Sequence, residues 1–455
     1  MDRRTFLGSI VAGAVAPAFL IRPQRSPAWK AGVATINITP DRSLWMAGFA
    51  RRKQASQGVS LPLHAKALAL QAGTGNPVVL VTTDLLGLTA RITDRVSAAL
   101  QQQHRIRRAD LLFNASHTHC GPVVDEQLSV AYDLTPEQWA DIRSYSEKLE
   151  EQLIAVVSEA LKRLAPARVG YSRGEATFAA NRRVSFKPLG PVDHSVPILR
   201  IDNANGTPVA MVFGYACHNT TLGDAFVQYH GDYAGVAQAE LEKRHQGATA
   251  LFVAGCGADA NPSPRGTPEL VQSHGVALAD AVDRALPSAT AIASSLRTSY
   301  GTVDLPFVGS DARERWKQQL KVDSVYLQRY DALMARQGPL PTKQPDPVQV
   351  WRFGPALSER AGAAGESKGN FTMVALGGEV VVDYALRLAG ENKNETMWVA
   401  GYSNDVFGYV PSLRVLREGG YEGADAMIYY GRPGPFTEEV EELIVGKVRE
   451  LMSRA

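Results

Sequence analysis

Two histidines that lie one residue apart are the most informative chemical feature of the sequence. They are His117 and His119, in the segment Asn114–Pro122, which follows the apolar run Leu111–Phe113. Because alternate side chains of an extended chain share a face, both imidazoles are expected to project into one cleft. Neutral imidazole is the commonest metal ligand among side chains, so the pair predicts the beginning of a metal site.

Three further segments share the pattern of an apolar strand that ends in a turn with polar residues. They cover residues 213–220, 252–262 and 374–379, and they contain His218, Asn261 and Glu379, respectively. Ligands of open α/β sheets bind beyond the carboxyl ends of the strands, so we expect these segments to converge on His117.

Catalytic zinc is often held by two histidines and one glutamate, with one position left for water. His117, His218 and Glu379 supply such a set. A histidine at a strand end is often a hydrogen-bonded structural residue, and for His218 taken alone that explanation serves equally well. The set is therefore a hypothesis that depends on the three segments meeting.

Strands and helices alternate along most of the chain. Apolar periodicity predicts strand–helix–strand units over residues 77–115 and 208–254, and a helix that begins at Glu379. The two strands of such a unit run parallel. We therefore expect an α/β fold with a mixed, mostly parallel sheet flanked by helices, and a site at the carboxyl ends of its strands.

One domain is expected over residues 26–455, because no linker or internal repeat divides them. Residues 307–370 are predicted to form an insertion or lid, since they combine a charged helical stretch with a proline-rich one. Residues 1–25 are set apart and are discussed below as an export signal.

Composition excludes several classes of function. The 455 residues are 45% hydrophobic and 21% charged, with a formal net charge of +2, and no run of five like charges occurs. Such a chain is an ordinary globular protein with no basic arm for nucleic acid. Three cysteines, Cys120, Cys217 and Cys256, cannot form a closed disulfide framework. They are interpreted as buried small residues, with a ligand or nucleophile role as the alternative.

The first 25 residues resemble a twin-arginine export signal. Arg3 and Arg4 precede an apolar stretch rich in alanine and glycine that ends near Leu20. A membrane anchor is the alternative, but the stretch is shorter than the roughly 20 residues that a spanning helix needs. We expect removal of the signal, a periplasmic or secreted protein, and no stable membrane anchor.

The chain resembles the catalytic domain of the neutral ceramidase family. His-Thr-His-x-Gly-Pro, the strand-end histidine, an Asp-x-x-Pro turn and the late Gly-Tyr and Tyr-Glu-Gly-Ala pieces occur in the family's order, between Ile38 and Gly423. The resemblance implies a zinc site. Its ligands would be His117, His218, Glu379 and Tyr409, with His119 as a proton-handling group and Tyr421 and Arg182 in the substrate pocket.

One position departs from the family pattern. Ala258-Asp259-Ala260-Asn261-Pro262 carries an asparagine where the family's ceramidases have a serine. An amide cannot become an alkoxide nucleophile, but it can donate a hydrogen bond to a developing oxyanion. The departure argues against ceramide itself as the substrate. A single helix is expected after Tyr421, so no second domain like the family's β-sandwich is predicted.

The sequence favours an exported zinc-dependent hydrolase that cleaves an N-acyl amide bond with zinc-activated water. His119 would pass a proton to the leaving amine, and Tyr421 and Asn261 would stabilise the oxyanion. One alternative is a zinc-dependent esterase or lyase that acts on a sugar acid or glycan. Another is a non-catalytic binding protein on the same scaffold. The substrate, lipid or glycan, and the oligomeric state stay open at this point.

Overall fold

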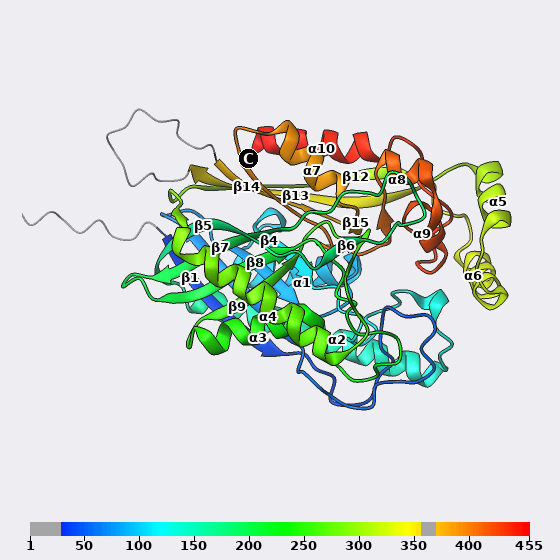
Figure 1. The fold of residues 1–455 in the computed structure, drawn as a ribbon, viewed down its shortest axis with the longest axis horizontal. Coiled ribbons are helices and arrows are strands. Elements are labelled where there is room, and N and C mark those ends of the chain that lie inside the picture. The colour runs from blue at the N-terminus through cyan, green and yellow to red at the C-terminus, as the bar shows by residue number, and fades with distance from the viewer. Residues whose placement is uncertain (1–28, 356–369) are drawn as a thin grey trace, which may run out of the picture.

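Two β-sheets stacked face to face form the centre of the protein (Figure 1). The computed structural model describes residues 29–355 and 370–455. The larger sheet has nine strands in the order β4-β3-β2-β1-β5-β7-β8-β9, with β11 paired to β5. Its strands are β1 (Trp29–Asn37), β2 (His64–Ala72), β3 (Val78–Thr83), β4 (Leu111–Ala115), β5 (Ala165–Glu175), β7 (Ser195–Asn203), β8 (Pro208–Tyr215), β9 (Thr249–Ala254) and β11 (Thr290–Ala291).

The smaller sheet has four strands in the order β12-β13-β14-β16. They are β12 (Leu296–Pro306), β13 (Lys343–Pro355), β14 (Asn370–Leu376) and β16 (Thr396–Ala400). Two short pairs complete the described strands. Antiparallel β6 (Ala179–Asn181) pairs with β10 (Ala260–Pro262), and parallel β15 (Glu379–Val380) pairs with β17 (Tyr409–Val410).

Helices cover the outer faces of both sheets, which gives four layers (Figure 1). Those on the larger sheet are α1 (Ala90–His104), α2 (Pro136–Lys162), α3 (Asp232–Arg244) and α4 (Pro268–Ala285). Those on the smaller sheet are α7 (Asp383–Glu391) and α10 (Val440–Arg454). The shorter helices α5 (Ser310–Gln319), α6 (Ser324–Gln337), α8 (Leu413–Glu418) and α9 (Gly420–Gly423) lie towards one end.

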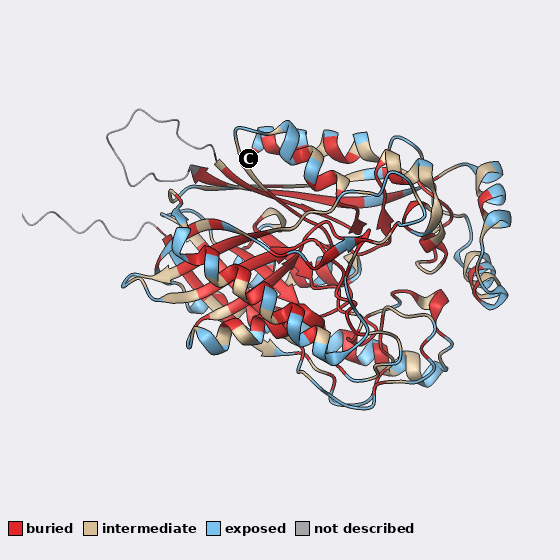
Figure 2. Ribbon diagram, viewed as in Figure 1, coloured by how far each residue is buried: buried red, intermediate tan, exposed pale blue. Residues whose placement is uncertain are grey.

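The core between the two sheets is apolar. Leu112 and Val212 of the larger sheet share one buried cluster with Trp351 and Trp398 of the smaller sheet. Figure 2 shows the sheets as buried, whereas the outer faces of the helices are exposed. Burial on both faces explains why these strands read as continuous apolar runs rather than alternating ones. None of the helices in residues 29–355 and 370–455 is long and apolar enough to cross a membrane.

The α/β class and the mixed sheet flanked by helices are confirmed, but the sheets are mostly antiparallel rather than mostly parallel. In the described part of the two sheets, only β3–β4, β8–β9 and β14–β16 run parallel. Each of these pairs is joined by a crossover that contains a helix, whereas the other neighbours pair antiparallel, as hairpins do. The parallel units are those that precede the predicted metal ligands.

The segment predicted as an insertion contains a strand that was not expected. Residues 343–355 form β13, which pairs with both β12 and β14. Pro345 and Pro347 made this stretch look like a loop, because proline cannot donate to a ladder. Both lie in the part of β13 that pairs with β12 alone, before pairing with β14 starts at Val348. The predicted export signal, residues 1–25, lies outside the described residues.

Candidate functional site

One asparagine connects β4 and β9, the two edge strands of the nine-stranded sheet. Asn114, in β4, accepts a hydrogen bond from the backbone N–H of Ala254, at the end of β9, at 2.8 Å. Its amide group also donates to the carbonyl of Gly401, just after β16 of the other sheet, at 2.8 Å. The carboxyl ends of β4, β9 and β16 are therefore held together. The loops that follow them enclose the predicted site.

His117 reaches the site from a loop rather than from an extended strand. Strand β4 ends at Ala115, and His117 has a φ of +63° in the left-handed region. The expectation that His117 and His119 share a strand face is therefore wrong, although their rings do meet with centroids 5.0 Å apart. Backbone hydrogen bonds impose this conformation, because the N–H of His117 donates to Leu85 and that of His119 to Asn219.

Both predicted histidine ligands are oriented through Nδ1. The Nδ1 of His117 lies 2.6 Å from the carbonyl oxygen of Leu86, and that of His218 lies 2.9 Å from the carbonyl of Gly257. A carbonyl oxygen only accepts, so each Nδ1 carries the ring proton and each Nε2 of a neutral ring presents a lone pair. Metal-binding histidines are typically oriented by such hydrogen bonds.

Glu379 completes a cluster of three hydrogen-bond acceptors. Its Oε2 lies 3.0 Å from Nε2 of His117 and 3.1 Å from Nε2 of His218, and all three side chains are buried. Burial lowers the pKa of His218 to about 4, so its ring is neutral at pH 7. Three lone pairs at this spacing repel one another unless a cation lies between them.

The Nε2 of His117 forms no hydrogen bond to any described residue despite its burial, as expected of an atom that faces a metal. The donor set of two imidazoles and one carboxylate fits zinc. Glu379 was expected to open a helix, but it lies in β15, which pairs with Tyr409 in β17. That pairing is tertiary, and α7 begins only at Asp383. It brings the fourth predicted ligand to the cluster.

Tyr409, Arg182, Tyr421 and Asn261 lie on one side of the cluster. The Tyr409 hydroxyl is 3.2 Å from Nε2 of His218 and accepts a hydrogen bond from Arg182 at 2.9 Å. Tyr421 packs its ring 5.3 Å from that of Tyr409, and Arg182 also contacts Asn261 at 3.5 Å. All four predicted residues are therefore brought to the cluster. Tyr421 is 45% exposed, which places it at the mouth.

His119 is the third histidine of the cluster. The ligand-type nitrogens of His117, His119 and His218 lie within 4.8 Å of one another. Neither ring nitrogen of His119 forms a hydrogen bond to any residue in the described ranges. The ring packs against Phe49, with centroids 4.7 Å apart, and a side chain at Gly48 would collide with it. His119 is thus held in place while both of its nitrogens stay available.

Three residues around the site were not predicted from the sequence. The hydroxyl of Tyr430 donates to Oε1 of Glu379, Glu422 binds Nε of Arg182 at 2.6 Å, and Tyr402 packs on the ring of His117 at 4.4 Å. Burial raises the pKa of Tyr430 well above its usual value, so this hydroxyl keeps its proton. Only Glu422 carried a signal, since it belongs to the Tyr-Glu-Gly-Ala motif.

The three cysteines take no part in the chemistry proposed for the site. All are free and buried, and burial raises the pKa of Cys120 to about 12. A thiol with such a pKa is protonated and a poor ligand or nucleophile.

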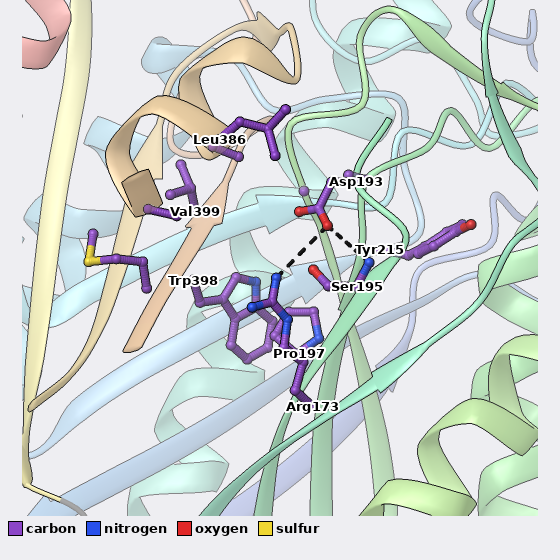
Figure 3. A pocket seen from close by; sticks show the side chains of 13 residues that line it. Arg173, Asp193, Ser195, Pro197, Tyr215, Leu386, Trp398 and Val399 are labelled. Atoms are coloured by element: carbon purple, nitrogen blue, oxygen red, sulfur yellow. Dashed lines mark hydrogen bonds and ion pairs between the residues drawn. The ribbon is translucent and has the colours of Figure 1, made fainter. Parts of the chain in front are cut away.

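A separate small pocket has a volume of about 50 Å³. Its lining includes Arg173, Tyr215 and Trp398 (Figure 3). None of the eight predicted site residues lines it.

Comparison with known proteins places the chain in a family. The family described as neutral/alkaline non-lysosomal ceramidase, N-terminal, matches residues 29–263, just over half of the chain. Neutral ceramidase B of Dictyostelium discoideum is 25% identical over an alignment of 247 residues, and the match covers 48% of this chain and 33% of that protein. Neutral ceramidase A of the same organism is 23% identical over an alignment of 265 residues, and the match covers 52% of this chain and 36% of that protein. The matched segment thus spans about a third of each relative's length.

Solved structures agree with this assignment at the level of the fold. The structure described as "Ceramidase complexed with C2" has a TM-score of 0.71 and 17% identity, and the match covers 94% of this chain and 76% of that one. Neutral ceramidase from Pseudomonas aeruginosa has a TM-score of 0.69 and 18% identity, with 94% and 75% covered. The family match and the shared fold lead to one conclusion: the chain belongs to the neutral/alkaline non-lysosomal ceramidase family.

Proposed function

We propose that this protein is an exported zinc-dependent hydrolase that cleaves an N-acyl amide bond. Membership of the ceramidase family supports hydrolysis of an amide-linked substrate. The observation that carries the metal site is the position of Glu379 Oε2, which lies 3.0 Å from Nε2 of His117 and 3.1 Å from Nε2 of His218. With Tyr409 they would hold the ion. The arginine pair near residue 3 supports export, which cell fractionation of the full chain would test.

Zinc, when bound, would polarise the scissile carbonyl and lower the pKa of a water ligand to about 7. The protein's own part in proton transfer falls to His119. Its two nitrogens have no partner among the described residues, and its ring contacts that of His117. A general acid or base must reach the proton that it moves, and His119 is placed beside the cluster to do so. Burial holds the pKa of His119 well below its usual value, so its ring starts neutral. We assign it removal of a proton from the attacking water and delivery of that proton to the leaving amine.

The side-chain amide of Asn261 has a donor group that no described residue accepts. Its Oδ1 faces Nη1 of Arg182 at 3.5 Å and the hydroxyl of Thr220 at 3.3 Å. Arginine has no acceptor, so the atom that faces it must be the amide oxygen. The Nδ2 group then forms no hydrogen bond to another described residue and can donate. This supports a role in stabilising a developing oxyanion, together with Tyr421.

Arg182 is a fixed part of this wall rather than a free cation. Its Nε binds Glu422 at 2.6 Å and its Nη2 binds the Tyr409 hydroxyl at 2.9 Å. Because Glu422 neutralises its charge, Arg182 is poorly suited to recognise a uronic acid. The site therefore favours amide hydrolysis over the sugar-acid lyase alternative. The intact donor set likewise argues against a purely binding role.

The experiment is a substrate screen on the purified protein of known zinc content. We expect zinc at about one ion per chain by elemental analysis. We also expect amine release from one or more N-acyl compounds, abolished by a chelator and restored by zinc. Uronic-acid oligosaccharides serve as the comparison. If zinc-loaded protein releases no amine but produces unsaturated sugars that absorb in the ultraviolet, the proposal is wrong.

A further inference from the structure

Tyr430 contacts the one oxygen of Glu379 that the histidines leave free. Oε2 of Glu379 faces Nε2 of both His117 and His218, at 3.0 and 3.1 Å. Its Oε1 instead accepts a hydrogen bond from the hydroxyl of Tyr430. The two carboxylate oxygens are thus in different surroundings, one turned towards the cluster and the other held by a phenol.

A carboxylate can bind a cation through one oxygen or through both. Catalytic zinc needs a coordination position for water or substrate, and every ligand atom added by the protein competes for it. While Oε1 accepts the hydrogen bond from the Tyr430 hydroxyl, Oε2 is the oxygen that Glu379 presents to the cluster. We propose that Tyr430 is a positioning residue that restricts Glu379 to one-oxygen binding and so keeps a coordination position open. This inference rests on the proposed zinc site.

Three contacts hold Tyr430 in place independently of Glu379. Its ring lies 6.4 Å from that of Tyr409, and it packs beside Gly408, where an added Cβ would lie 3.7 Å from its Cγ. The next residue, Gly431, has a φ of +61°, which turns the chain sharply. Arg432 then donates from Nε to the carbonyl of Phe407 at 2.8 Å, which ties this turn to the segment just before Tyr409.

Tyr430 also has a second environment. Its ring lines a cavity of about 590 Å³ together with Tyr300, Asp405 and Arg432. The four predicted ligands do not line this cavity; they are His117, His218, Glu379 and Tyr409. Tyr430 therefore contacts the ligand cluster on one side and the cavity on the other. Tyr300 therefore provides a matched control, because it lines the same cavity but does not contact Glu379.

The test compares Tyr430→Phe with Tyr300→Phe, each of which removes one hydroxyl and keeps the ring. Zinc affinity is measured by competition with a chelating indicator, and the visible absorption of the cobalt-substituted proteins reports the coordination number. We expect zinc binding to weaken about 10- to 100-fold in Tyr430→Phe, the usual effect of losing a partner of a ligand. We also expect weaker cobalt absorption, because a two-oxygen Glu379 raises the coordination number. Tyr300→Phe should match the wild type.

Circular dichroism of the metal-free proteins checks that both variants are folded. A folded Tyr430→Phe with an unchanged cobalt spectrum would overturn the inference, whatever its zinc affinity. A weaker cobalt absorption that Tyr300→Phe does not share supports it. If the wild-type protein itself binds no zinc, it is the proposed metal site that fails, and the two failures are thereby distinguished.

Discussion

Replacing Asp405 by asparagine is expected to stabilise the protein at neutral pH. Asp405 is only 7% exposed, and burial raises the pKa of its carboxyl from 3.8 to about 6, although Arg432 acts in the opposite direction. Its Oδ1 accepts a hydrogen bond from the N–H of Ala90, the first residue of α1, at 3.0 Å. An asparagine oxygen can accept the same hydrogen bond, so the substitution removes the charge and keeps the contact.

The direction in which stability changes with pH depends on whether the folded or the unfolded protein binds the proton more tightly. A carboxyl whose pKa is higher in the folded than in the unfolded protein binds its proton more tightly when folded. That contribution to stability is complete below the unfolded value of 3.8 and is lost as the pH rises through about 6. At 1.36 kcal/mol per pKa unit, the loss above that range amounts to about 3 kcal/mol. Asparagine does not titrate and avoids this loss.

The assay is urea unfolding of the wild type and Asp405→Asn from about pH 4 to about pH 8. The two free energies of unfolding should differ least at about pH 4 and diverge between about pH 4 and pH 6, with the variant the more stable. Asp94→Asn, an exposed change on helix α1, should stay within about 0.5 kcal/mol of the wild type. A variant less stable than the wild type at pH 8, or a difference that does not depend on pH, would refute the reasoning.

The remaining predictions concern the site and the asparagine that closes the sheet. His117→Ala should lose zinc by elemental analysis. His119→Ala should keep its zinc, and its rate of amide hydrolysis should fall about 100-fold or more. Loss of zinc from both variants would make His119 a ligand instead. Asn261→Ala should lower kcat about 100- to 1000-fold with little change in KM, and an effect on KM alone would contradict its oxyanion role. Asn114→Ala should lower the free energy of unfolding in urea by about 1–3 kcal/mol, because it leaves the buried N–H of Ala254 without an acceptor. A change below about 0.5 kcal/mol would show that Asn114 does not close the sheet.

Local patterns were sufficient to locate the elements that carry the site. The strands that precede His117, His218 and Asn261 were predicted within about two residues of β4, β8 and β9, because buried parallel strands read as short apolar runs. Family motifs added Tyr409 and Tyr421, which periodicity alone would have treated as core. The structure brings all eight predicted residues together. Their chemical roles stay predictions.

The errors arose where distant segments decide the outcome. Pro345 and Pro347 indicated a loop, but the strand they belong to is stabilised by partners more than 40 residues away in β12. Glu379 was assigned to a helix, but pairing with Tyr409 makes it a strand. Tyr430 carried no signal at all, since a tyrosine that binds a carboxylate looks like any other tyrosine in a sequence.

The sequence by itself determined the strand–helix–strand units, the donor types at their carboxyl ends and the family to which the chain belongs. Those properties depend on neighbours along the chain and on motif order. Only the tertiary structure decided that two sheets rather than one supply the ligands, that Asn114 joins strands 140 positions apart, and that Tyr430 holds Glu379. These are hydrogen bonds between side chains and strands far apart in sequence, and local propensity carries no information about which distant atoms will meet.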